Sequence, residues 1–314
     1  MSARNPFTGA AVITFKQLGD TLLLEPALRH LRSRFGVPPT LFAKPGFEPL
    51  IELMADARVP AEFSGRFDQL WVFEPGTKAA RKALFTRARE KKAVLLRPKY
   101  LQWYHRLIFD RIRTEQPGFF EYRARFLHRE VGGADADFRP PTLKAPPEAW
   151  APRTCLPSDY LLLCPTAAWE SKRWSTESWG EAIEGIAARC SLPMLMVGGG
   201  SSWERTHASQ IEASAAPAIA NLVGHTSLRE LLFLVSKARG ALCIDGAVAH
   251  LAAAFDVPSI TMFGPTRSDE WHWPTSRSVA LCAADYSGDE QPSLSCLPSA
   301  PVVAATVEIL NTAL

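Results

Sequence analysis

Short apolar runs alternate with amphipathic stretches along almost the whole chain. In the first half, each apolar run is of the kind found in buried strands, and the stretch after it repeats its apolar residues at helical spacing. This pattern predicts strands at 11–15, 40–43, 69–73 and 93–96, and helices at 22–35, 47–55, 77–92, 101–113 and 119–130. Strands that alternate with helices form parallel sheets covered on both faces. The first half is therefore predicted to be an α/β domain.

The periodic pattern stops between residues 132 and 158. This stretch contains six prolines and two glycines and has little periodicity. Such composition is typical of a linker between domains. We therefore expect a first domain at 1–133, a proline-rich linker at 134–158 and a second domain at 159–300.

The alternation restarts after the linker. Strands are predicted at 160–164, 194–197, 241–244 and 259–263, and helices at 176–190, 202–214, 228–238, 248–255 and 301–314. Two α/β halves joined by a linker predict a bilobal protein with two Rossmann-like β/α/β lobes and a cleft between them. Ligands of open α/β sheets bind at the carboxyl ends of the strands, so candidate residues are sought there.

Composition agrees with two lobes in a cytoplasmic protein. The chain has 314 residues, 47% of them hydrophobic, which is too many for one ordinary core. The amino terminus does not have the pattern of a signal peptide, and no run of 18 apolar residues predicts a membrane span. The six cysteines form no C-x-x-C pair, so we expect reduced thiols, with Cys164 and Cys243 buried in strands.

Charge is divided unevenly between the halves. Residues 1–150 carry 25 Lys and Arg against 16 Asp and Glu, whereas the remainder is acidic. Two interpretations stay open at this point. The basic half either binds something anionic or presents an ordinary solvated face.

The strongest local candidate is the segment 241–250, which reads ALCIDGAVAH. Asp245 ends an apolar strand, and Gly246 and Ala247 open a helix whose first N–H groups suit a phosphate or diphosphate. His250 lies one turn further and is placed to contact the same ligand. The alternatives are that Asp245 only caps the helix and that His250 is structural.

Two other turns follow strands in the second half. Residues 164–174 read CPTAAWESKRW, where Thr166 offers a hydroxyl and Lys172 a cation for an anionic ligand. The alternative is a surface loop whose tryptophans, Trp169 and Trp174, pack on the core. Residues 197–202 read VGGGSS, which is neither a P-loop nor a dinucleotide fingerprint. Kinase and NTPase chemistry is therefore disfavoured.

The first half offers one candidate carboxylate at a strand end. Gly19 permits a tight strand-to-helix turn, and Asp20 begins the helix, either as a cap or as a general base facing a cleft. The only D-x-D spacing, Asp135 and Asp137, falls in the linker. We therefore expect neither a divalent metal nor a cofactor.

Taken together, these segments resemble glycosyltransferase family nine, the bacterial heptosyltransferases of lipopolysaccharide core synthesis. Residues 16–26, KQLGDTLLLEP, are similar to the family's S-x-G-D-x-x-x-x-x-P opening, and 165–174 to its P-G-(variable)-K-R-W loop. Residues 221–231, NLVGHTSLREL, resemble its N-L-x-G-x-T-S-L-x-E-L segment, and 245–266 its D-(S/T/G)-G-x-x-H-x-A-A-A … F-G-P-T segment. Order and spacing agree throughout.

The resemblance implies a GT-B fold and an inverting, metal-independent transfer of a sugar. It implies ADP-heptose as the donor and a lipopolysaccharide core or related glycan as the acceptor. No nucleic acid is expected as a partner, because no recognition motif accompanies the basic residues. The family's general base matches Asp20. Its donor-binding positions match Thr166, Lys172, Thr226, Asp245, Gly246, Ala247 and His250.

The resemblance also implies how the ends and the basic residues are used. The closing helix, 301–314, is expected to pack back across the lobes. Family acceptors are phosphorylated glycolipids at the inner membrane face, so the basic residues of 78–92 and 106–129 are expected to hold such an acceptor or touch anionic lipid.

Several positions depart from the family. Thr166 replaces a frequent glycine, and Ala247 replaces the usual glycine of the diphosphate loop. The turn at 198–202 lacks the acid that some members place on the donor ribose, and Glu204 comes one turn later. The alternatives that remain are another donor, a protein or other glycan as acceptor, and a catalytically silent nucleotide-sugar-binding protein.

Overall fold

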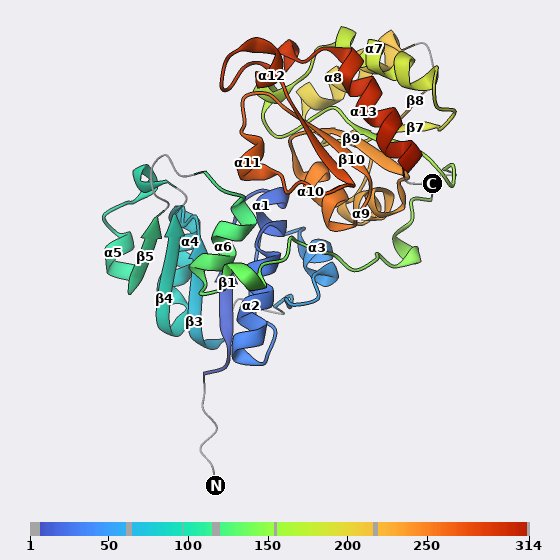
Figure 1. Cartoon of the computed structure of the whole chain (residues 1–314). Coiled ribbons are helices and arrows are strands. Elements are labelled where there is room, and N and C mark those ends of the chain that lie inside the picture. The colour runs from blue at the N-terminus through green and yellow to red at the C-terminus, as the bar shows by residue number, and fades with distance from the viewer. Residues whose placement is uncertain are drawn as a thin grey trace. The chain divides into compact units, whose positions relative to one another are not determined.

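The computed structural model describes residues 7–60, 65–95, 97–114, 120–153, 156–215 and 219–312. It divides into two compact units, Met1–Leu143 and Lys144–Leu314 (Figure 1). The division falls inside the proline-rich segment, where prolines interrupt regular hydrogen bonding. The finer division of the chain at 133, 158 and 300 stays a prediction.

The first unit is built on a five-stranded parallel sheet in the order β2-β1-β3-β4-β5. Its strands are β1 (Ala10–Ile13), β2 (Thr40–Phe42), β3 (Arg66–Phe73), β4 (Arg87–Leu95) and β5 (Arg111–Thr114). Its helices are α1 (Leu18–Leu22), α2 (Glu25–Phe35), α3 (Glu48–Leu53), α4 (Thr77–Phe85), α5 (His105–Ile108) and α6 (Arg123–Glu130). The strand order reverses direction between β1 and β3. The carboxyl ends of these two strands therefore form the switch point, where ligands bind in such sheets.

Two helices predicted in this unit are wrong in part. The predicted helix 77–92 ends at Phe85 and the chain continues as β4, while only His105–Ile108 of the predicted helix 101–113 is α-helical. Residues 87–95 pair with β3 on one side and β5 on the other. Pairing in the sheet overrides the helical preference of Arg, Lys and Glu here. Lys92 is accommodated because it pairs with Glu90 at 2.8 Å and lies 4.8 Å above the Trp71 ring.

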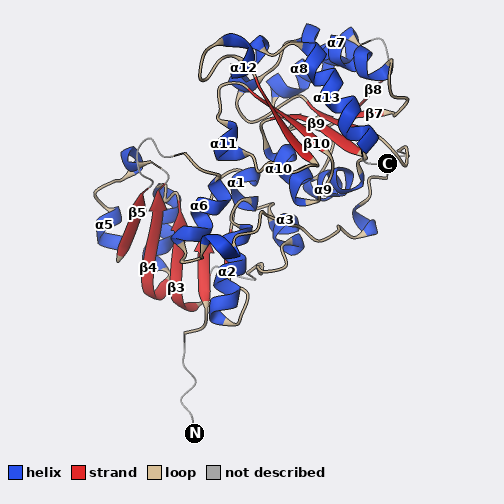
Figure 2. Ribbon diagram, viewed as in Figure 1, coloured by secondary structure: helices blue, strands red, loops and turns tan. Residues whose placement is uncertain are grey.

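The second unit holds a six-stranded parallel sheet in the order β11-β10-β9-β6-β7-β8 (Figure 2). The strands are β6 (Leu161–Cys164), β7 (Met194–Met196), β8 (Ile219–Asn221), β9 (Gly240–Ile244), β10 (Ser259–Phe263) and β11 (Ser278–Cys282). The helices are α7 (Thr176–Ala187), α8 (Ser202–Ser214), α9 (Leu228–Lys237), α10 (Ala247–Ala254), α11 (Ser268–Trp271), α12 (Ala284–Ser287) and α13 (Ser299–Thr312). The predicted α/β class with two parallel sheets is confirmed. The edge strands β8 and β11 were not predicted, because each is only partly buried and β8 is in addition only three residues long.

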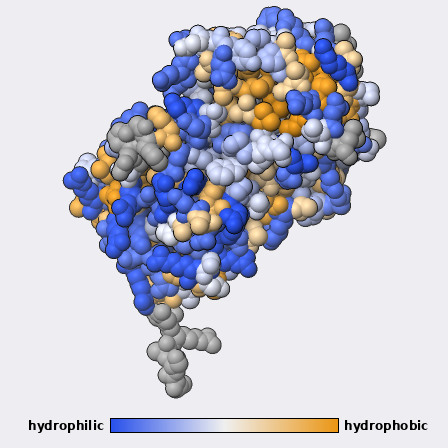
Figure 3. Space-filling model, in the orientation of Figure 1, coloured by the Kyte–Doolittle hydropathy of each residue, from blue (hydrophilic) through white to orange (hydrophobic). Residues whose placement is uncertain are grey.

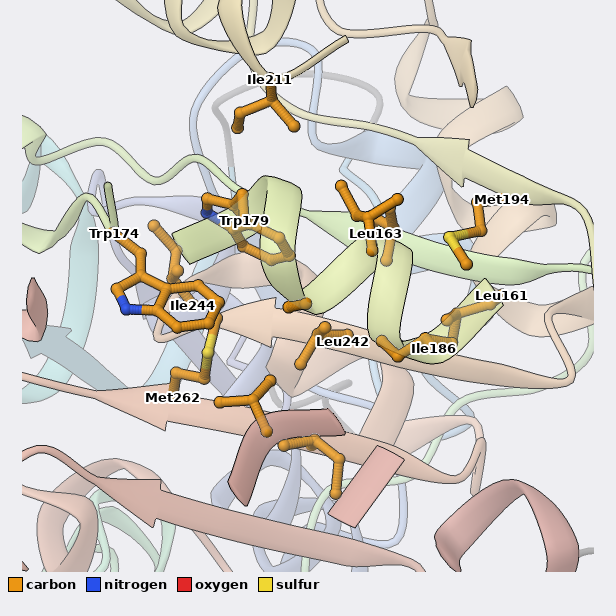
Figure 4. Packing of buried hydrophobic residues seen from close by; sticks show 14 of the residues in the cluster. Leu161, Leu163, Trp174, Trp179, Ile186, Met194, Ile211, Leu242, Ile244 and Met262 are labelled. Atoms are coloured by element: carbon orange, nitrogen blue, oxygen red, sulfur yellow. The ribbon is translucent and has the colours of Figure 1, made fainter. Parts of the chain in front are cut away.

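The core of the second unit lies between the sheet and the helices that cover it (Figure 4). Trp174 and Trp179 are fully buried with ring centroids 5.4 Å apart, and the Trp174 indole N–H donates to the Leu297 carbonyl at 3.0 Å. The alternative interpretation of this loop, in which both tryptophans pack on the core, therefore holds for Trp174. It does not hold for Trp169, which is 62% exposed.

Helix α13 packs against α7 and against β9 and β10 of its own unit. Gly185 of α7 permits the close approach, because a β-carbon there would lie 2.9 Å from Val303 of α13. The expected packing of this helix across to the first unit stays a prediction.

Two buried thiols face each other in the second sheet. Cys164 of β6 and Cys243 of β9 are register partners and are free, as the sequence predicted. A hydrogen bond with Cys164 and burial raise the pKa of the Cys243 thiol well above its ordinary value, so it stays protonated and inert.

Within the described part of the chain, no helix has the length and apolar character needed to cross a membrane.

Candidate functional site

The second sheet has its switch point between β6 and β9. Counted from β6, its strands lie in the order third, second, first, fourth, fifth and sixth, which is the Rossmann order. The segments that follow β6 and β9 contain Lys172 and Asp245 respectively. In sheets of this order the ligand crevice opens at this point, so both candidate segments lie where the fold favours ligand binding.

Lys172 and Asp245 form a close ion pair at this edge. The Lys172 Nζ lies 2.5 Å from Asp245 Oδ2 and 3.3 Å from the Asp245 carbonyl oxygen. The Thr266 hydroxyl donates to the same Oδ2 at 2.7 Å. The Lys172 ammonium also lies 5.1 Å from the centre of the Trp169 ring. Asp245 is buried and Lys172 nearly so, which makes the pairing strong and its geometry fixed.

The turn from β9 into α10 places Asp245 beside the loop that follows β6. The Asp245 N–H donates to the Met262 carbonyl at 3.0 Å, which continues the ladder between β9 and β10. A β-carbon on Gly246 would lie 3.3 Å from Ala167 Cβ, so glycine lets the two segments touch. Ala247 then begins α10, an eight-residue helix. Its first N–H groups and dipole can compensate a negative charge brought to Lys172.

Thr166 lies beneath the glycine turn that follows β7. Its side chain is buried, its hydroxyl has no hydrogen-bond partner among the described residues, and a β-carbon on Gly198 would lie 2.2 Å from that hydroxyl. Position 198 must therefore be glycine, because any side chain there would collide with the Thr166 hydroxyl. The Thr166 hydroxyl makes no hydrogen bond with Lys172 or Asp245. Its predicted contact with the nucleotide-sugar donor stays a prediction.

Glu204 belongs to the amino terminus of α8. Its carboxylate accepts hydrogen bonds from the Gly199 N–H at 3.0 Å, the Ser201 N–H at 3.2 Å and the Ser201 hydroxyl at 2.6 Å. The bond from the Ser201 N–H belongs to a capping box of α8, and the other two bonds hold the carboxylate against the glycine turn. The carboxylate that follows the glycine turn therefore closes that turn, and its bonds would have to break before it could bind a ribose.

Thr226 lies on a turn that adjoins the glycine turn. The Gly224 N–H donates to the Gly198 carbonyl at 3.3 Å, and the two turns approach so closely that a β-carbon on Gly224 would lie 3.1 Å from Gly200 Cα. Thr226 is half-buried and immediately precedes Ser227, the cap of α9. A nucleobase contact from Thr226 stays a prediction.

His250 and His272 lie near the ion pair. The His250 ring is 6.3 Å from the Trp271 ring, and His272 Nε2 lies 3.0 Å from the Ser278 hydroxyl. Burial and, after it, the charge of His250 lower the pKa of His272 to about 4, while Asp245 acts in the opposite direction. Neither Thr266 nor His272 was predicted from the sequence as a site residue. The F-G-P-T segment contained a signal for Thr266, whereas the W-H-W context of His272 contained none.

His272 makes stability depend on pH. Its folded pKa lies below the ordinary value, so its contribution is complete above pH 6.5 and is lost as the pH falls toward about 4. At pH 5 it should lower the free energy of unfolding by about 2 kcal/mol relative to pH 8. Denaturant titrations of the wild-type protein and His272→Gln at both pH values check this, because the variant should lose less stability on acidification. Equal losses in the two proteins would contradict it.

In the first unit, Asp20 follows β1 at the switch point of the five-stranded sheet. Its Oδ2 accepts a hydrogen bond from the Gln17 N–H at 3.2 Å, so the capping role is confirmed. Gly19 is buried inside the same short helix, α1. The Asp20 carboxylate is half-buried, which leaves a surface for a second partner. The general-base role stays a prediction.

A second carboxylate lies at this switch point and was not predicted. Glu74 follows β3, has a positive φ of 53° and keeps its side chain buried. Lys16, which follows β1, lies 3.3 Å from it. Such strained backbone is often retained where a loop must hold one shape. The Lys16–Glu74 pair ties together the two loops that flank the switch point.

Comparisons with known proteins agree with this arrangement. The family model described as Glycosyltransferase family 9 (heptosyltransferase) matches residues 81–297. Lipopolysaccharide heptosyltransferase 3 of Escherichia coli is 26% identical over 195 residues, which cover 57% of this chain and 56% of that protein. Lipopolysaccharide heptosyltransferase 1 of Pseudomonas aeruginosa is 32% identical over 110 residues, covering 34% of this chain and 29% of that protein. The chain thus spans about half the length of the first of these relatives and less of the second.

Solved structures share the fold over nearly the whole chain. ADP-heptose lipopolysaccharide heptosyltransferase II of E. coli has a TM-score of 0.78 at 17% identity, covering 97% of this chain and 99% of that one. A family 9 glycosyltransferase of Veillonella parvula has the same TM-score at 15% identity, covering 99% of both chains. These likenesses confirm the predicted GT-B fold. Together with the family model, they show that this chain belongs to glycosyltransferase family 9, the heptosyltransferase family.

Proposed function

We propose that this chain is an inverting, metal-independent glycosyltransferase that moves heptose from ADP-heptose to a lipopolysaccharide core or related glycan acceptor. The observation that carries the proposal is the Lys172–Asp245–Thr266 cluster at the switch point of the second sheet. A heptosyltransferase of E. coli has been solved with ADP and with ADP-2-deoxy-2-fluoro heptose, which supports an ADP-sugar as the donor here.

The second unit is proposed to bind the donor diphosphate. Lys172 supplies a positive charge, and the amino terminus of α10, from Gly246 onward, supplies N–H groups. As the bond from the sugar to the diphosphate breaks, negative charge grows on the leaving ADP. A fixed cation and a helix amino terminus stabilise that charge without a metal. His250 is proposed to contact the diphosphate or the sugar from the next turn of α10.

The first unit is proposed to supply the base. As an acceptor hydroxyl attacks the anomeric carbon from the face opposite the diphosphate, its proton passes to Asp20. The new glycosidic bond forms as the bond to the diphosphate breaks, which inverts the anomeric configuration. Asp20 thus has two partners in the proposal, the Gln17 N–H that holds it and the acceptor hydroxyl.

One observation favours an alternative donor. Ser202 begins α8, and Glu204 is held by three hydrogen bonds to Gly199 and Ser201. A donor held through an acid on its ribose would therefore find no ready carboxylate here.

Another nucleotide sugar, or a protein or other glycan as acceptor, fits the same diphosphate site. A silent nucleotide-sugar-binding protein is the third alternative, against which the presence of Asp20 argues.

A calorimetric and thermal-shift screen of nucleotide sugars tests the proposal. ADP-heptose should stabilise the protein more than ADP-glucose, UDP-glucose or GDP-mannose, and a donor at a hundred times its Kd should add about 2.7 kcal/mol. Addition of EDTA should leave binding and transfer unchanged. A preference for UDP- or GDP-sugars would favour the alternative donor, and failure to bind any nucleotide sugar would reject the proposal.

A further inference from the structure

We propose that a pocket at the amino ends of β3 and β4 binds a small organic oxyanion, a carboxylate or phosphate carried on an aromatic body. The pocket has a volume of about 440 Å³ and is called the Arg66–Arg87 pocket below. Its lining includes two arginines, three phenylalanines and a threonine, namely Arg66, Arg87, Phe42, Phe67, Phe85 and Thr86. The site goes beyond the proposed function, because neither the donor nor the acceptor is proposed to bind there.

The Arg66–Arg87 pocket lies at the opposite edge of the first sheet from the proposed general base. Arg66 begins β3 and Arg87 begins β4, whereas Asp20 follows the carboxyl end of β1. The strands of this sheet are parallel, so their amino ends lie along one edge. β4 runs nine residues from Arg87 to Leu95, which spans about 26 Å. A small ligand held by Arg87 therefore cannot reach Asp20.

Two positive charges meet in this pocket without a counter-charge. Arg66 and Arg87 are register partners on neighbouring strands, so their backbones are about 4.8 Å apart and their side chains share one face of the sheet. Both are exposed, and among the described residues neither guanidinium has a hydrogen bond, an ion pair or a ring contact. Like charges placed side by side repel each other. An oxyanion between them removes the repulsion, because guanidinium groups donate paired hydrogen bonds to carboxylates and phosphates.

The other basic residues of β4 all have a partner. These pairs are Arg89 with Asp68, Lys91 with the Leu84 carbonyl, and Lys92 with Glu90, at 3.6, 3.0 and 2.8 Å. The charge left uncompensated at Arg87 is thus an exception on this strand rather than a consequence of its basic composition. It points to a ligand that supplies the missing negative charge.

Aromatic rings give the pocket an apolar lining. The rings of Phe42 and Phe67 lie edge to face with centroids 6.2 Å apart, and both side chains are buried in a core cluster. Phe85 lines the same pocket but is 77% exposed. Figure 3 shows mostly hydrophilic residues along the lower edge of the first unit, where Figure 1 draws the amino ends of β3 and β4. An aromatic body on the ligand would pack on these rings and cover Phe85.

The backbone around the aromatic lining is held in place. The Thr86 N–H and hydroxyl both donate to the Lys82 carbonyl, at 3.1 and 2.8 Å, which fixes the turn that follows Phe85. A β-carbon on Gly65 would lie 2.6 Å from the Phe67 ring, and Gly65 has a φ of 144°, a conformation that side chains rarely adopt. Glycine therefore lets the Phe67 ring fold back into the lining. The pocket is thus formed without a ligand, as small-molecule sites usually are.

Calorimetry on the full chain with naphthyl phosphate and with naphthoate tests the inference. Both anions should bind at one site, and their relative affinity identifies the head group. Naphthol, which has the same body without the charge, should bind about thirtyfold more weakly. Arg66→Gln and Arg87→Gln should each raise the Kd about tenfold, and the double variant about a hundredfold, because charged hydrogen bonds are lost. Phe85→Ala should raise it about fivefold by removing a ring contact.

Arg106→Gln is the matched control, because it removes an exposed arginine of the same unit that does not line the pocket. This variant should bind both anions as the wild type does. Since Arg66 and Arg87 are exposed, the double variant should keep the Tm of the wild type. An unchanged Tm separates lost binding from lost folding.

Five outcomes would overturn the inference. These are no saturable binding of either anion, equal binding of naphthol, unchanged binding by the double variant, displacement of naphthyl phosphate by ADP, and its displacement by phosphatidylglycerol vesicles. The last two would assign the anion to the donor site and to a bilayer respectively. Calorimetry with ADP-heptose on the double variant separates this inference from the proposed function. Lost naphthyl phosphate binding with unchanged donor binding supports the pocket, whereas absent donor binding in the wild type rejects the function alone.

Discussion

Asp20→Asn should reduce transfer about a thousandfold while leaving the affinity for the donor unchanged. The substitution removes the basic carboxylate that the proposed mechanism needs. It keeps an oxygen that can still accept the hydrogen bond of the Gln17 N–H, which is 3.2 Å from the carboxylate. Helix α1 should therefore keep its cap, and the loss should appear in kcat rather than in folding. Single-turnover transfer assays and donor calorimetry on the same preparation measure the two quantities.

A matched control is available near the amino end of β3 in the same sheet, away from the carboxyl ends of the strands. Asp68 also accepts one backbone hydrogen bond, from Gly9 at 3.0 Å, and lies on β3. Asp68→Asn makes the same chemical change away from those carboxyl ends, so transfer should persist. Normal turnover by Asp20→Asn would remove Asp20 from the mechanism. Loss of transfer in both variants would point to folding instead.

The sequence predicted the sheets better than the charged segments around them. Apolar strands such as β9 and β10 are recognisable because both faces are buried. β4 was read partly as a helix because residues 87–92, RAREKK, have the composition of a surface helix. What makes them a strand is pairing with β3 and β5, and a single segment contains no information about its partners.

The candidate site was likewise predicted only in part. The resemblance to the family assigned Lys172 and Asp245 to one donor site, and the structure brings their side chains together although 73 positions separate them. The sequence did not predict that the two side chains neutralise each other or that Thr266 completes the cluster. It also did not show that the Thr166 hydroxyl lies beneath Gly198. Such details depend on side-chain packing between segments, which strand order alone does not determine.

Lys172→Met should weaken both folding and donor binding, and a second substitution separates the two effects. Removing the ammonium leaves the buried Asp245 carboxylate with the Thr266 hydroxyl at 2.7 Å. An unpaired buried charge of this kind costs about 3 kcal/mol, which corresponds to a fall in Tm of roughly 6–12 °C. Donor affinity should fall about thirtyfold to a hundredfold, because a charged hydrogen bond to the diphosphate is lost.

The double variant Lys172→Met with Asp245→Asn should recover most of the stability, because neither charge remains buried. It should not recover donor affinity, because the cation for the diphosphate is still absent. The control Lys237→Met breaks an exposed pair with Glu148, whose atoms are 2.6 Å apart, and should change neither quantity. Denaturant titration and calorimetry with ADP measure both effects. If the double variant regained stability and affinity together, Lys172 would serve only to neutralise Asp245, and the diphosphate would have to be held by the α10 amino terminus without it.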